Sequence, residues 1–220
     1  MSQEGTLRAP TETYREAVER AAGWLGRQLN PDGSMNPVEK GALTYYKVPR
    51  GFQVVGRLRE AHAMLDWAGR TILTPDGDFA AERQAFHHYH YTYSSAWFVW
   101  VAQLLGRFDV SYRGMEYLRR FRNPHTGGYC SEATYAADNH NEQDLLSISF
   151  NAFVGLHLGL VHEARAAAAL IRRILDQQPD PETRVWLRAD AEGGLVARVD
   201  PGCDEPRYYV LEIEAPEQYY

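Results

Sequence analysis

The chain has 220 residues, a formal net charge of −6, 45% apolar residues and 24% charged residues. These values are those of an ordinary globular protein with a sizeable core, and they predict a single domain over residues 1–220. Basic and acidic residues alternate along the chain. No basic patch of the kind that binds a phosphate backbone forms, so nucleic acid is excluded as a partner.

The first ten residues are polar and lack the apolar stretch of a signal peptide, and no segment approaches the roughly 20 apolar residues of a membrane span. The two cysteines, Cys130 and Cys203, are far apart and outside any Cys-x-x-Cys spacing, which fits a reducing compartment. We therefore expect a cytoplasmic protein without a membrane partner.

Helical spacing of apolar residues predicts an all-α chain. The first helix begins at a capping box formed by Thr13 and Glu16 and ends before Asn30. Further helices are expected over residues 51–73, 81–105, 111–121, 141–160 and 163–175. The second half of segment 81–105 is apolar nearly all round, which is typical of an inner helix surrounded by other helices. Beyond Asp176, alternating stretches at 184–188, 195–199 and 208–213 predict short strands or an extended excursion.

A short glycine motif recurs after several of these helices. It stands at residues 32–34, 76–78, 126–129 and 192–195, as Asp-Gly-Ser, Asp-Gly-Asp, Thr-Gly-Gly-Tyr and Glu-Gly-Gly-Leu. Intervals of several tens of residues indicate stacked supersecondary units.

At residues 28–34 and 117–129 this motif, with the helix end before it, resembles the repeat of the terpenoid cyclase and protein prenyltransferase superfamily. The resemblance implies an α/α toroid, here a partial α/α barrel of helical hairpins. It also overlaps with other toroids, such as the N-acylglucosamine 2-epimerase type and the unsaturated glucuronyl hydrolases. It therefore supports a fold more than a function.

The chain departs from that family in three respects. The Asp-x-Asp-Asp acid motif of the triterpene cyclases is absent. The segment 200–204, Asp-Pro-Gly-Cys-Asp, lacks the setting of the prenyltransferase zinc site, so we expect no metal and no other cofactor. Three hairpins and the start of a fourth are visible, where such toroids usually have six. The sequence leaves open whether the chain is truncated or whether another subunit, either a second copy or a different chain, completes the ring.

The densest group of chemically active side chains is His87-His88-Tyr89-His90-Tyr91-Thr92-Tyr93. On a helix, His90 would share one stripe with Tyr93, Trp97 and Trp100, which predicts an imidazole and a phenol at the mouth of an aromatic-walled pocket. His87 and His90 are the candidate proton carriers. The alternatives are that these rings only pack with their polar atoms hydrogen-bonded, or that His87 and His90 bind a metal with distant ligands.

A second candidate group is Asp144, Ser147 and Asn151, spaced three and four residues apart on an otherwise apolar helix. Asp144 lies in the first helical turn, where the helix dipole favours its ionised form, so a base or orienting role is expected. The alternative is a capping carboxylate, with Ser147 and Asn151 in hydrogen bonds between helices.

The third candidate group precedes the second predicted helix. Tyr45 and Lys47 are expected to bind substrate, Tyr46 to donate a hydrogen bond, and Lys47 with Arg50 to bind a carboxylate or phosphate. Exposed loop residues that cap a hairpin are the alternative. No Walker loop, Rossmann glycine pattern, His-Glu-x-x-His or nucleophile elbow is present, which excludes nucleotide, flavin and serine-hydrolase functions.

The favoured hypothesis is a cofactor-independent acid–base enzyme, an isomerase, lyase or cyclase, acting on a small, partly apolar, terpenoid-like substrate in the toroid cavity. Trp97 and Trp100 would form its aromatic wall, with Asn151 among the binding residues. One alternative is a carbohydrate epimerase or hydrolase in which Glu142 and Asp144 exchange protons with the sugar. Another is a non-catalytic helical-repeat module that binds a partner protein.

Overall fold

The computed structural model of the chain describes residues 10–36, 46–79, 90–138, 141–203 and 205–213. This part of the chain is mostly helical, with seven α-helices and two small antiparallel sheets. The prediction of a helical fold is thereby confirmed. Among these residues, none of the helices has both the length and the apolar character needed to cross a bilayer.

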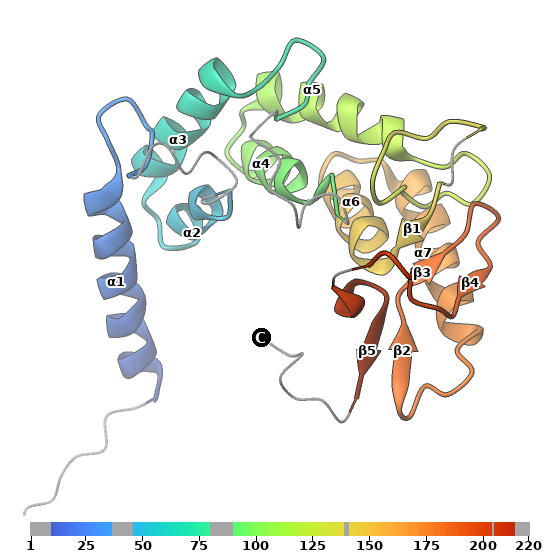
Figure 1. Cartoon of the computed structure of the whole chain (residues 1–220). Coiled ribbons are helices and arrows are strands. Elements are labelled where there is room, and N and C mark those ends of the chain that lie inside the picture. Colours follow the sequence, from blue (N-terminus) through green and yellow to red (C-terminus); the bar gives the residue numbers. More distant parts are fainter. Residues whose placement is uncertain (1–9, 37–45, 80–89, 139–140, 204, 214–220) are drawn as a thin grey trace, which may run out of the picture.

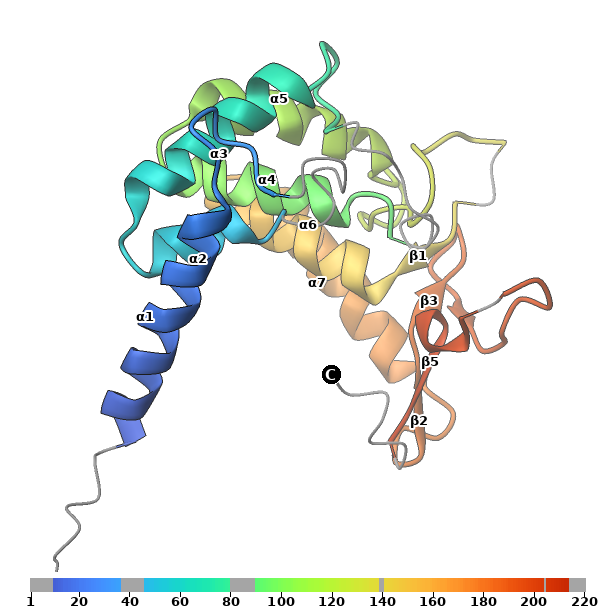
Figure 2. The same ribbon diagram turned by 60° about the vertical axis from the view of Figure 1, so that its left-hand side comes forward.

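Six of the helices form three antiparallel hairpins that follow one another along an arc (Figure 1). The inner row consists of α2 (Val48–Val54), α4 (Tyr93–Leu104) and α6 (Leu145–His157). The outer row consists of α3 (Leu58–Thr71), α5 (Phe108–Leu118) and α7 (Val161–Asp176), with a 3₁₀ turn at Arg119–Phe121 after α5. The remaining helix, α1 (Pro10–Gln28), and the strands lie at opposite ends of the arc in both ribbon views (Figure 2). Because α1 already begins at Pro10, Thr13 lies inside the helix and does not cap it.

A glycine with positive φ ends each inner helix. At Gly56 the backbone turns (φ 78°), and the N–H of Arg57 donates to the carbonyl of Phe52 at 2.8 Å, which is the closing bond of a Schellman motif. Gly106 and Gly159 form the same turn in the next two hairpins. The single helix predicted over 51–73 is therefore wrong, since this segment holds the end of α2, the turn at Gly56 and all of α3. The helix predicted over 81–105 is shorter in its described part, where α4 begins at Tyr93.

The recurring glycine motif packs each repeat onto the next outer helix. Gly33 (φ 90°) lies against the backbone of Ala63 in α3, and Gly77 (φ 98°) lies against that of Arg113 in α5. A Cβ at either glycine would overlap the carbonyl oxygen of that helix residue. Gly127 lies against Ala166 of α7, where a Cβ would overlap the Cβ of that alanine. The motif therefore joins successive hairpins, as the spacing in the sequence predicts.

Two small sheets are formed mainly by strands that follow α7. Strand β3 (Arg188–Ala189) lies between β1 (Gln143–Asp144) and β4 (Leu195–Val196), and β2 (Arg184–Trp186) pairs with β5 (Val210–Glu212). All pairs are antiparallel, and the register sets Asp144 opposite Arg188. The expected short strands after Asp176 are confirmed. A strand that precedes α6 joins them, and this pairing brings the residues near 188 and 208 to the start of an inner helix.

The main core lies between the two rows of helices. Its centre contains Phe79 and Phe98, whose rings stack at 4.8 Å, with Met64, Leu65 and Leu118 fully buried around them. A second cluster between α6, α7 and β3 fixes the position of β3 against α6.

Candidate functional site

Asp144 caps the N-terminus of α6. Its backbone is extended (φ −113°, ψ 152°), and its Oδ1 accepts a hydrogen bond from the N–H of Ser147 at 2.8 Å. Aspartate is one of the preferred residues at this position because its short side chain reaches a free amide of the first turn. The residue is 1% exposed. A buried carboxylate at a helix N-terminus is stabilised as the anion by the helix dipole.

His90 provides the partner of this carboxylate. It lies in a turn directly before α4, and its Nδ1 is 3.1 Å from Asp144 Oδ1. Burial alone would raise the pKa of Asp144, but His90 and the hydrogen bond from Ser147 hold the pKa well below its usual range. Because Nδ1 faces Asp144, Nε2 is the ring nitrogen that does not face the carboxylate.

The pair borders a cavity of about 340 Å³ with mainly apolar walls. Besides His90 and Asp144, the cavity is lined by Leu145, Leu146, Ser149, Leu187, Arg207, Tyr208 and Leu211. The ring of Tyr208 meets the imidazole of His90 edge-on at 4.8 Å. The volume is within the range of small-molecule sites, and the walls favour an apolar ligand.

A buried arginine that the sequence analysis did not select lies behind the pair. Arg188 is fully buried, and its Nη1 is 3.0 Å from Glu142 and 3.3 Å from Glu132. Its position between Leu187 and Ala189 in a predicted strand is the signal that could have identified it, because a charged residue between apolar neighbours is unusual unless it is paired. Tyr208 was missed because only the pairing of β2 with β5 brings it to His90.

Glu142 faces a different cavity. This second cavity has a volume of about 250 Å³ and more polar walls, which include Glu132, Glu142, Arg198, Asp200 and Tyr209. Asp144 does not line it, and Glu142 does not line the cavity beside His90. The two carboxylates therefore do not flank one common space.

The aromatic residues of the predicted pocket form a separate cluster on the inner row. Tyr93 contacts Tyr46 at 5.8 Å and Trp97 at 6.3 Å, and Trp97 contacts Trp100 at 5.3 Å between ring centroids. Lys47 Nζ lies 5.4 to 5.8 Å from the rings of Tyr46, Tyr93 and Trp97. These distances are typical of cation–π contacts.

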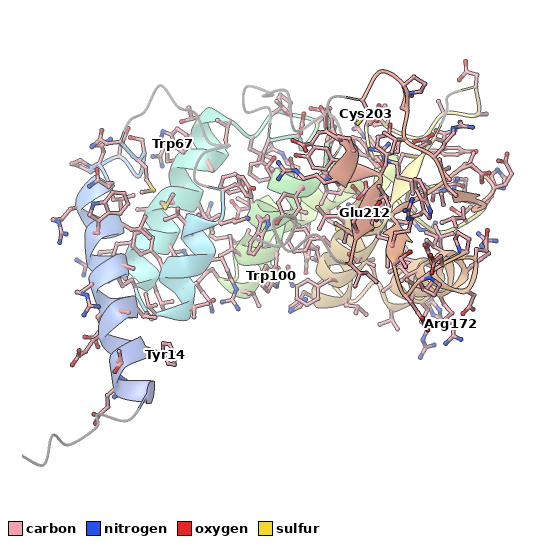
Figure 3. All side chains as sticks on the ribbon, turned by 60° about the horizontal axis from the view of Figure 1, so that its bottom comes forward. Tyr14, Trp67, Trp100, Arg172, Cys203 and Glu212 are labelled. Carbon is pink, nitrogen blue, oxygen red and sulfur yellow. The ribbon has the colours of Figure 1, made fainter. Side chains whose placement is uncertain are left out.

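One further contact and one shifted pKa characterise this cluster. The guanidinium carbon of Arg50 lies 4.6 Å from the ring of Trp100, which is labelled in Figure 3. Burial, and then the neighbouring Tyr93 and Tyr208, raise the pKa of Tyr46 to about 12. The sequence placed His90 in the same stripe as Tyr93 and the two tryptophans, but its ring turns towards Asp144 and Tyr208, since it precedes the helix.

Asn151 joins α6 to α4. Its Nδ2 donates to Thr92 Oγ1 at 2.7 Å and to the carbonyl of Ser147 at 2.8 Å. These hydrogen bonds correspond to the structural alternative that the sequence left open for this residue. His87 and Tyr45 lie outside the described residues.

No protein-family model, curated protein or solved structure matches this chain. In the described residues, no three His, Cys, Asp or Glu side chains are grouped so that they could hold a metal ion. What the site can do must therefore be argued from its own geometry, and that geometry offers one carboxylate-paired imidazole beside an apolar cavity.

Proposed function

We propose that this chain is an acid–base enzyme, an isomerase, lyase or cyclase, that acts without a cofactor on a small, partly apolar, terpenoid-like substrate. One observation carries the proposal: His90 Nδ1 lies 3.1 Å from the buried carboxylate of Asp144 at the edge of an apolar cavity. A histidine oriented by a carboxylate is a common general acid–base, and it typically contributes 10²–10⁴-fold to the rate.

In this mechanism Asp144 stays ionised and holds the Nδ1–H tautomer of His90. Nε2 then accepts a proton from a C–H or O–H bond of the substrate and returns it at another position. The carboxylate of Asp144 is itself buried and the cavity walls are mainly apolar, which strengthens the electrostatic interaction between the pair. Asp144 is an orienting group in this scheme and does not itself take the proton.

The proposal includes an α/α toroid as the scaffold. It is supported by the inner and outer rows of helices, by the shared turns at Gly56, Gly106 and Gly159, and by the motif that packs each hairpin on the next. The carbohydrate alternative has less support, because it requires Glu142 and Asp144 on one cavity and they line different ones.

The test is a proton-exchange assay in D₂O. A panel of small apolar ketones, enones and alkenes is first screened for binding by saturation-transfer NMR, and the binders are then followed for loss of C–H signals. We expect the wild-type chain to catalyse exchange in at least one binder and the His90→Gln variant to be at least about 100-fold slower. His162→Gln, which alters an exposed histidine on α7, is the control. Binders without exchange, or exchange that persists in His90→Gln, would contradict the acid–base role.

A separate observation favours self-association as a further property. Each hairpin end presents exposed apolar side chains on both sides of its glycine: Val54 and Leu58, Leu104 and Phe108, Leu156 and Val161. Nearby charges are paired within the chain, Arg57 with Glu60 and Arg107 with Asp66 and Asp109. We propose that this row binds the same row of a second copy, since an exposed apolar row whose neighbouring charges are already paired within the chain can pack against a copy of itself. Sedimentation of Leu58→Glu/Phe108→Glu should then show a smaller species than the wild type.

A further inference from the structure

Arg188 is the fully buried charge nearest to the proposed catalytic pair. Its guanidinium contacts two carboxylates, with Nη1 3.0 Å from Glu142 Oε2 and 3.3 Å from Glu132 Oε1. Its Cζ lies 4.2 Å from the ring centroid of Tyr209. A buried arginine held by acids on one side and by a ring on the other has a fixed position, because its planar fork allows few alternative arrangements.

The first link from Arg188 to the site runs through Asp144. The two residues are directly opposite in the β1–β3 pair, so their side chains stand on the same face of the sheet. Burial alone would lower the pKa of Arg188, but Asp144 and other neighbouring acidic groups keep the pKa above its usual value. Asp144 therefore has two neighbours of different kinds, the imidazole of His90 and the permanently charged guanidinium of Arg188.

The second link runs through Tyr208. Arg188 Nε donates to the carbonyl of Tyr208 at 3.3 Å, and the ring of Tyr208 meets His90 at 4.8 Å. Arg188 thus contacts the backbone of the residue that covers one edge of the imidazole. The same guanidinium thus interacts electrostatically with the carboxylate that flanks His90 and donates to the backbone of the residue whose ring flanks it.

We propose that Arg188 is a positioning residue of this site, which holds Asp144 and Tyr208 so that His90 keeps its proton on Nδ1 and presents Nε2 to the cavity. The inference rests on the proposed function of the His90–Asp144 pair. Groups that orient a reacting side chain through one intermediate residue commonly change its reactivity without touching the substrate. Arg188 acts in this way, through Asp144 on one side and Tyr208 on the other.

The test is ¹⁵N NMR of the histidine rings at pH 8.5, where free histidine is neutral. His90 is assigned by the signal that is lost in His90→Gln. In the wild type we expect the Nδ1–H tautomer alone. In Arg188→Gln we expect a mixture of tautomers, and in Arg188→Lys, which keeps the charge but loses the fork and the ring contact, a smaller change in the same direction. Arg184→Gln is the matched control, because Arg184 lies on neighbouring β2 and pairs with Glu212 at the surface.

Each outcome decides a different claim. A mixture of tautomers in the wild type would refute the proposed function of the pair, whatever Arg188 does. A pure tautomer in the wild type and an unchanged His90 signal in folded Arg188→Gln would overturn only the inference about Arg188. If Arg188→Gln does not fold, the Arg188→Lys spectrum decides in its place. With an exchanging substrate in hand, Arg188→Lys should lower kcat by roughly 10- to 100-fold with little change in KM.

Discussion

The buried carboxylate of Asp144 predicts a specific dependence of stability on pH. The pKa of Asp144 is below its unfolded-state value of about 3.9, so its ionised form stabilises the fold above that pH, and this stability is lost as the pH falls. Because the lowered pKa keeps Asp144 ionised in the folded protein while the unfolded chain takes up the proton, the loss between pH 5 and pH 3 is about 1 kcal/mol from this one group. Asp144→Asn removes the titration but keeps a side-chain oxygen that can cap α6. The free energy of unfolding of the wild type should therefore approach that of the variant by about 1 kcal/mol over this range.

Urea unfolding at pH 5, 4 and 3 measures this difference, and Asp109→Asn serves as the comparison. Asp109 also has a lowered pKa, mainly through its hydrogen bond with Arg107, but it lies at the surface. Its contribution should shrink in 0.5 M NaCl, whereas that of Asp144 should not, because salt screens exposed charges far more than buried ones. Parallel pH profiles for wild type and Asp144→Asn would refute the assignment of Asp144 as a stabilising anion.

Three further predictions concern the scaffold and the aromatic cluster. Gly77→Ala should destabilise the fold by about 2–4 kcal/mol in urea unfolding, because its φ of 98° and the close helix backbone both exclude a Cβ, while Gly69→Ala inside α3 should be neutral or stabilise by up to about 1 kcal/mol. Phe98→Ala should cost about 3–5 kcal/mol by the same assay and Leu175→Ala, at a 47% exposed position, far less. Tyr46→Phe should remove a phenol that ionises near pH 12 in a spectrophotometric titration. Above about pH 10 the unfolded chain loses this proton before the folded chain does, so the wild type loses stability as the pH rises. The variant should therefore lose less stability between about pH 10 and 12.

The helical fold could be predicted from the sequence because the apolar spacing and the glycine motifs both act locally. The hairpin boundary at Gly56 could not be found from periodicity, since apolar residues continue at helical spacing from Phe52 to Leu65 across the turn. The repeat offered a better signal. Val55-Gly56-Arg57 and Leu105-Gly106-Arg107 are similar triplets 50 residues apart, and each closes an inner helix with the same hydrogen bond. A comparison of the repeats would have revealed a boundary that propensity does not show.

The residues of the candidate site also differ in whether the sequence could identify them. Asp144 and His90 could be selected separately, one as a helix-start carboxylate and the other within a dense histidine cluster. Their pairing could not be deduced, because 54 positions separate them and neither lies where a regular helix stripe would direct it. Tyr208 and Arg188 depend still more on tertiary structure, since both reach the site only through pairings between short strands. Strands of two or three residues carry too little periodicity to fix a register from sequence.

The short strands thus determine the environment of the Asp144 carboxylate, although they contain only two or three residues each. An N-cap aspartate at an open helix end would be hydrated, and its carboxylate would be satisfied by water and by the first-turn amides. Here β1 continues directly into α6 and pairs with β3, so the same residue that caps the helix is also covered by a sheet. The sheet removes water from the carboxylate and supplies Arg188, while the turn before α4 supplies His90. A capping interaction that stabilises many helices is converted in this way into a buried anion beside an imidazole, and the proposed proton transfer rests on this arrangement.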